Sequence, residues 1–179
     1  MDPNTSRKVS ASIQEFRLPT YQEIPDVGLY LEQTAKYISD CLAPVQDMPV
    51  TGSMISNYVK KGLIAKPVRK QYSREQIAQL IFICVAKAVL SMDDVHLMLT
   101  VQRQTYPSQI AYDYFRTELN HVLDCVFSRT SELRTLDASA TDQKVMLRNT
   151  IIALAHKIYL DKLFAVIRED MKQQSNETN

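Results

Sequence analysis

Three residues in the second half of the sequence have the types and spacing of a nucleophilic site. His121, Asp124 and Cys125 stand at positions i, i+3 and i+4, which share one face of a helix. A cysteine beside a histidine can act as a nucleophile. A residue inside a helix is poorly exposed, however, and no oxyanion-stabilising group accompanies this pair. We therefore expect packing and surface roles for these residues, and no enzymatic activity.

Cofactor and metal chemistry is not indicated either. The sequence contains no glycine-rich phosphate loop and no metal-ligand spacing, so we expect no cofactor and no metal. Its three cysteines are far apart, which is typical of buried thiols in a cytoplasmic protein. The N-terminus MDPNTSRKVSASIQ lacks the hydrophobic region of a signal peptide. The most apolar run, residues 151–167, is interrupted by charged residues, so no membrane association is expected.

The clearest chemical feature is a cluster of positive charge. The net charge of the chain is only +1, yet residues 60–74 contain six basic residues and no acidic one. A charge run is often only a solvated surface. An acid-free basic window on a hairpin instead favours contacts with the phosphates of a nucleic acid. The six residues are Lys60, Lys61, Lys66, Arg69, Lys70 and Arg74.

Two short elements carry this cluster. Thr51 or Ser53 can cap a short helix, and Gly62 can end it in a left-handed conformation. The next ten residues, 63–72, have the pattern of two short extended pieces joined by a turn at residues 66–68. The sequence therefore predicts a short helix followed by a basic β-hairpin.

Helices are expected on both sides of these elements. Asp26 can cap a helix that runs to about residue 42. Ser73 and Gln76 match a capping box, and the helix after them has the clearest apolar periodicity in the chain. Ser91 can cap the next helix. With only three glycines available for tight turns, the fold is predicted to be mostly α-helical.

The second half is predicted to hold two long helices. One runs from residue 107 to about 136, and the other from about 142 to 171, with a polar break between them. The last helix is apolar enough to be surrounded by protein. It either packs within the chain or pairs with a second copy to form a homodimer. The sequence alone leaves both arrangements open.

The order of these elements resembles the DNA-binding domain of MerR-type regulators, which is a winged helix-turn-helix. In that family a helix ending in tyrosine is followed by Gly-Leu, a basic wing with an Arg-x-Tyr element, and a helix that begins near an acid. Here Tyr58, Gly62-Leu63, Lys70-Gln71-Tyr72 and Glu75 stand at those positions, and SMDDVHLMLT is similar to the family's next helix. The longer chain also resembles a group of Firmicute proteins described as MerR-like.

The resemblance implies a bacterial transcriptional regulator that binds double-stranded DNA sequence-specifically. A helix of this kind enters the major groove, and the wing contacts the phosphates. Ser56 stands where the family usually has an arginine, with Lys60 and Lys61 nearby to compensate. The alternative is a protein-interaction module on the same scaffold that does not bind DNA. The residues implied to contact DNA are Ser53, Ser56, Asn57, Tyr58, Lys60, Lys61, Lys66, Arg69, Lys70 and Arg74.

The expected organisation has four parts. Residues 1–17 are a mobile tail, and residues 18–102 form the winged helix-turn-helix with its short β-hairpin wing. Residues 103–172 form a C-terminal helical region for dimerisation or packing. Residues 173–179 are predicted to be a disordered tail.

Overall fold

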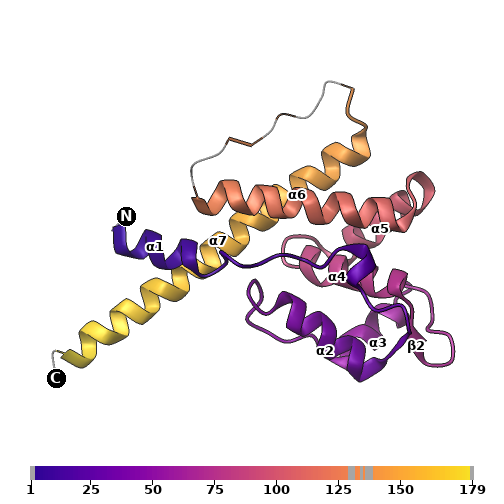
Figure 1. The fold of residues 1–179 in the computed structure, drawn as a ribbon, viewed down its shortest axis with the longest axis horizontal. Helices are drawn as coiled ribbons and strands as arrows, with labels where there is room; N and C mark the ends of the chain where they lie inside the picture. Colours follow the sequence, from indigo (N-terminus) through magenta and orange to yellow (C-terminus); the bar gives the residue numbers. More distant parts are fainter. Residues whose placement is uncertain (1–2, 129–131, 134, 136–138, 178–179) are drawn as a thin grey trace.

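The computed structural model describes residues 3–128, 132–133, 135 and 139–177. Over these residues the protein is mostly helical, with one small two-stranded antiparallel sheet (Figure 1). The elements are α1 (Pro3–Ala11), the 3-10 helix η1 (Tyr21–Glu23), β1 (Leu29–Tyr30), α2 (Leu31–Leu42), α3 (Gly52–Lys60), β2 (Gln71–Tyr72), α4 (Arg74–Ala86), α5 (Met92–Thr105), α6 (Ser108–Ser128) and α7 (Asp142–Glu177).

Helix α4 lies at the centre of the core. Eight of its thirteen residues are buried, and it packs against α2, α6 and α7. The predicted capping box is confirmed. The backbone N–H of Gln76 donates to Ser73 Oγ (3.3 Å), and the backbone N–H of Ser73 donates to Gln76 Oε1 (2.9 Å). The cap fixes the residue at which α4 starts. The apolar contacts with the surrounding helices determine where α4 lies in the fold.

The sheet differs from the predicted hairpin. Strand β2 pairs with β1, so that Leu29 lies opposite Tyr72, and residues 63–66 form no strand. The turn lies at residues 69–70 rather than at 66–68, and a single bridge joins Val68 to Gln71. The partner of β2 stands about forty positions earlier in the chain, which a local pattern does not reveal.

Helix α2 begins later than predicted. Asp26 does not cap it; the first helical residue is Leu31, and Gln33 accepts a hydrogen bond from the Tyr30 N–H (3.0 Å). Gly28 has a φ of +71°, a left-handed conformation that separates Asp26 from the helix and turns the chain into β1.

The predicted tails are wrong where the structure describes them. Helix α1 packs against α7, and Val9, Ile13 and Phe16 are buried. These three apolar residues give the first segment a surface to bury, so it is not a mobile tail. Helix α7 continues to residue 177, and residues 178–179 lie outside the described part of the chain.

The C-terminal helices pack within the chain. Helices α6 and α7 lie against each other and against α4, which is one of the two arrangements that the sequence left open. Helix α6 ends at Ser128, earlier than the predicted residue 136. Part of the predicted polar break lies outside the described residues. Over the described residues, no helix combines the length and apolarity that crossing a membrane requires.

Candidate nucleic-acid interface

Helix α3 presents a polar face to solvent. Thr51 caps it, accepting a hydrogen bond from the Met54 N–H (3.3 Å). Ile55 and Tyr58 form its buried face, as their spacing predicts. The remaining face therefore exposes Ser53, Ser56, Asn57 and Lys60. Figure 1 shows α2, α3 and β2 grouped at the end of the molecule opposite the C-terminal half of α7.

The end of α3 has the predicted glycine cap. Gly62 has a φ of +75°, and its N–H donates to the Val59 carbonyl (3.0 Å). The Leu63 N–H reaches back to the Tyr58 carbonyl (3.0 Å), which closes the last turn. The cap sends the chain into the basic loop, which we define as residues 63–70, and leaves Lys61 exposed beside it.

The basic loop is held at its base and exposed at its tip. Leu63 and Ile64 are buried, and Gln76 Nε2 donates to the Ala65 carbonyl (2.8 Å). The Arg103 guanidinium, at the end of α5, donates to the Leu63 carbonyl. Arg103 was not predicted as part of this site, because nothing in the sequence links it to residues forty positions earlier. These hydrogen bonds hold the first residues of the loop in place. The exposed cations Lys66, Arg69 and Lys70 come next in the sequence.

The tip of the loop is a tight turn with an unusual composition. The Gln71 N–H donates to the Val68 carbonyl (2.9 Å), while Arg69 and Lys70 have φ values of +51° and +64°. Positive φ at both central residues defines a type I′ turn, which strongly prefers Asn-Gly. Side chains with a Cβ lose about 1–2 kcal/mol in the left-handed region. The turn therefore holds two cations at a cost to stability.

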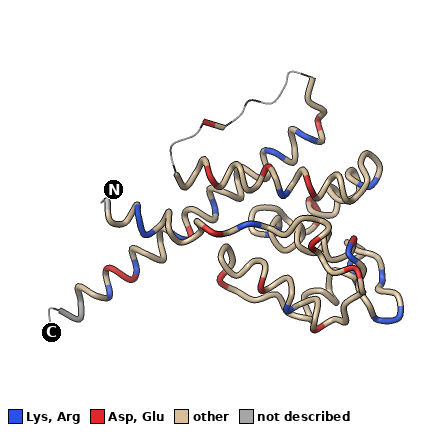
Figure 2. The backbone as a smooth tube through the Cα atoms, in the orientation of Figure 1, with Lys and Arg blue, Asp and Glu red and all other residues tan. Residues whose placement is uncertain are grey.

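The local charge is strongly positive (Figure 2). None of the five residues Lys60, Lys61, Lys66, Arg69 and Lys70 forms an ion pair with any residue that the structure describes. The nearby acids Asp26 and Glu75 already have partners, namely Arg74 and the Ser108 hydroxyl. The cations of this surface are thus free to meet an anionic partner.

Arg74 does not belong to this surface. Its Nε donates to the Ile24 carbonyl (2.8 Å), its guanidinium lies over the Tyr21 ring (5.8 Å) and it approaches Asp26 (3.8 Å). With its side chain only 24% exposed, Arg74 joins the segment before β1 to α4. The prediction that it contacts a phosphate is corrected on these contacts.

The prediction that the Tyr58 hydroxyl contacts DNA is also wrong. It is 4% exposed, and its hydroxyl lies beside the Cys84 thiol. Burial raises the pKa of the Tyr58 phenol and raises that of the Cys84 thiol to about 11. A hydroxyl inside the core does not reach a phosphate, so Tyr58 supports α3 from behind. Tyr72 is buried as well.

The nucleophile geometry is not that of an assembled catalytic pair. Cys125 Sγ lies 3.9 Å from His121 Nδ1 and 3.8 Å from its Nε2, so neither nitrogen is aimed at the sulfur. Cys125 is buried, with 7% of its surface exposed. Within the described residues, no group of three or more histidine, cysteine or acidic side chains is arranged to hold a metal ion.

These features define the protein as a mostly helical chain with a small antiparallel sheet and an exposed basic loop. Residues 19–115, more than half of the chain, match the family described as Domain of unknown function (DUF1836), and the protein belongs to that family. The matched stretch includes α3 and the whole basic loop. No curated protein and no solved structure matches the chain.

The reassignment of Arg74 is testable by stability. We expect Arg74→Met to lower the free energy of unfolding by about 1–3 kcal/mol, because it leaves the Ile24 carbonyl without its charged donor. Lys70→Met, at an exposed position, serves as the control and is expected to change stability by less than about 0.5 kcal/mol. Urea denaturation measures both, and equal stability of the two variants would contradict the structural role of Arg74.

Proposed function

We propose that the protein binds double-stranded DNA sequence-specifically and acts as a bacterial, cytoplasmic transcriptional regulator. The observation that carries this proposal is the exposed polar face of α3 beside a basic loop whose cations have no acidic partner among the described residues. Unpaired cations suit the binding of a polyanion, and polar side chains on an exposed helix can reach base edges in the major groove, which admits an α-helix.

In this proposal α2 and α3 act as a helix-turn-helix and the basic loop acts as the wing. Ser53, Ser56 and Asn57 face the base edges, since they are exposed on the side of α3 away from the core. The pairing of β1 with β2 joins the end of the basic loop to the start of α2. The resemblance to MerR-type regulators agrees with this assignment, although the 43–51 connection is longer than a tight helix-turn-helix turn.

The number of free cations sets the expected salt dependence. With Arg74 engaged inside the protein, five cations remain: Lys60, Lys61, Lys66, Arg69 and Lys70. If each meets one phosphate, the logarithm of the affinity falls against the logarithm of salt concentration with a slope of about −4.5 per subunit.

Charge reversal on the loop tests the proposal directly. We expect the triple change Lys66→Glu, Arg69→Glu and Lys70→Glu to lower affinity for duplex DNA at low salt by at least about 100-fold, because phosphate contacts become repulsions. Fluorescence anisotropy with a labelled duplex measures the affinity.

A variant with the same change in net charge is the matched control. Arg7, Arg17 and Lys144 are exposed outside α3 and the basic loop, and changing all three to glutamate should leave affinity within a few-fold. Equal loss in both triple variants, or none in either, would overturn the assignment of the loop.

Changing the strained turn should affect stability and DNA binding in opposite directions. Replacing Arg69-Lys70 by Asn-Gly gives the type I′ turn its preferred residues, so we expect the free energy of unfolding to rise by about 1–2 kcal/mol. The same change removes two cations, so the salt slope should become shallower by about 2.

The conservative Arg69→Lys variant keeps both strain and charge, and should change neither quantity. Denaturation and salt titration of the same samples measure the two effects. A more stable Asn-Gly variant with an unchanged slope would remove the turn from the DNA contact.

We further propose that the protein acts as a homodimer through residues 160–171 of α7. Leu160, Phe164, Ile167 and Met171 are each at least 40% exposed and are separated by four, three and four residues. This is the spacing of a two-helix seam. Asp161, beside this stripe, is already paired with Lys157 of the same helix (2.6 Å), so the apolar stripe alone carries the proposed pairing. A dimer presents two α3 helices to two half-sites.

We expect the double change Phe164→Glu and Ile167→Glu to convert the dimer to a monomer, because two buried charges would face each other across the seam. Sedimentation velocity at micromolar concentration measures the state. Leu97→Glu with Ile110→Glu, at exposed apolar positions on α5 and α6, is the control and should remain dimeric. A wild-type protein that sediments as a monomer would contradict the proposal.

One observation favours a second candidate function, a protein-interaction module on the same scaffold. Tyr30 and Val68 are exposed, and both lie beside Gln71 at the edge of the basic loop. Exposed apolar side chains among cations suit an acidic protein surface. A stable acidic protein partner that is lost in the loop triple variant, together with duplex affinity unaffected by that variant, would favour this candidate over DNA binding.

A further inference from the structure

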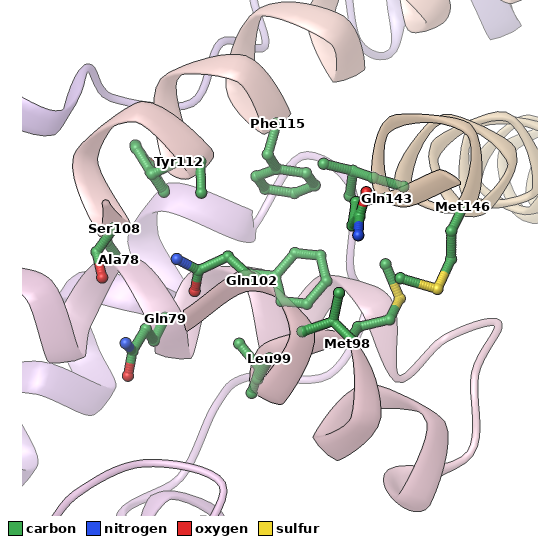
Figure 3. A pocket seen from close by; sticks show the side chains of 14 residues that line it. Ala78, Gln79, Met98, Leu99, Gln102, Ser108, Tyr112, Phe115, Gln143 and Met146 are labelled. Carbon is green, nitrogen blue, oxygen red and sulfur yellow. The ribbon is translucent and has the colours of Figure 1, made fainter. Parts of the chain in front are cut away.

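A pocket lies between four helices whose side chains leave a gap where the helices meet. It is lined by side chains from α4, α5, α6 and α7, and its cavity volume is about 80 Å³ within a half-open hollow of about 590 Å³ that includes solvent space (Figure 3). Small residues create the space, because Ala78 on α4 and Ala111 on α6 both line it. Unlike the basic loop, the pocket has no lysine or arginine among its lining residues.

The lining excludes charged ligands. None of the fourteen lining residues is acidic, basic or histidine. A carboxylate or ammonium group entering such a pocket would lose its hydration without gaining a counter-charge, which is strongly unfavourable. Nucleotides, phosphates and organic acids are therefore poor occupants, and an uncharged molecule is required.

The apolar walls suit an aromatic ring. Phe82 and Phe115 meet edge to face at the pocket, with ring centroids 5.2 Å apart and an interplanar angle of 88°. Met98 and Met146 supply thioether sulfurs, which contact ring edges favourably. An apolar cavity of about 150 Å³ accommodates benzene, and the cavity here is about half that size, so a ring fits only with part of it in the open portion of the hollow.

Two amide side chains provide polar contacts at separate walls of the pocket. Gln79 comes from α4 and Gln143 from α7, and Figure 3 shows them at opposite ends of the pocket. Among the described residues neither amide has a hydrogen-bond partner, whereas Gln102 already donates to the Tyr106 carbonyl (2.7 Å). Each free amide offers donors and an acceptor to a ligand.

We propose that this pocket binds a small uncharged aromatic molecule that carries an amide or hydroxyl group. The ring occupies the space between Phe82, Phe115 and the methionines, and the polar group bonds to Gln79 or Gln143. Ligand pockets typically combine such apolar walls with a few polar groups that fix orientation. The site is independent of DNA binding, and its test uses no DNA.

Benzamide is the probe and benzoate its charged counterpart of the same shape. We expect titration of the full chain, followed by chemical shifts of the pocket methionine methyl groups, to give a Kd for benzamide in the millimolar range or tighter. Benzoate should bind at least about tenfold more weakly, because its charge is unpaired in the pocket. Absence of benzamide binding, or equal binding of benzoate, would overturn the proposal.

Two variants locate the site. Ala111→Phe fills the space and should abolish benzamide binding, while Ile110→Phe, at the exposed neighbouring position, should leave it intact. Circular dichroism verifies that each variant folds. If Ala111→Phe does not fold, Gln143→Leu and Gln79→Leu together replace it; this pair should weaken benzamide binding but leave toluene binding unchanged. Benzamide binding that survives the folded variants would place the ligand elsewhere.

Discussion

The burial of α4 is the interaction on which the rest of the structure depends. Its apolar side chains face α2 on one side and α6 and α7 on the other, so the two halves of the chain share one core rather than two. Ile77, Leu80 and Ile81 are fully buried. Because each such side chain contributes about 1.5–3 kcal/mol on burial, α4 contributes a large share of the packing energy between the two halves. The proposed DNA surface and the pocket are both built on this one helix.

The polar start of α4 extends this control to the basic loop. Gln76 both completes the cap and donates to the Ala65 carbonyl, so the residue that starts the helix also holds the loop. Arg74, two residues earlier, fixes the segment before β1 through the Ile24 carbonyl. A loop anchored at carbonyls can expose every charged side chain it carries, because the backbone rather than those side chains determines its position.

Local features of the structure were predictable from the sequence. The Ser73 capping box, the Gly62 cap and the apolar face of α3 each depend on residues within one helical turn of each other. The positive cluster was equally visible. What the sequence did not reveal are contacts between distant segments: the pairing of β1 with β2, the packing of α1 on α7, and the burial of the Tyr58 hydroxyl against Cys84. Each depends on which surfaces meet, and propensity carries no information on that.

The misplaced turn is the most informative of these differences. Pro67 indicates a turn at residues 66–68, yet the chain turns at Arg69 and Lys70, two residues with no preference for the left-handed conformation. A fold selected for stability alone would have asparagine and glycine there. Sequences break local rules mainly at functional or strained sites. Under the proposed function, the two cations at the tip of this anchored loop contact a polyanion, and that contact would explain why they occupy the turn against their own backbone preference.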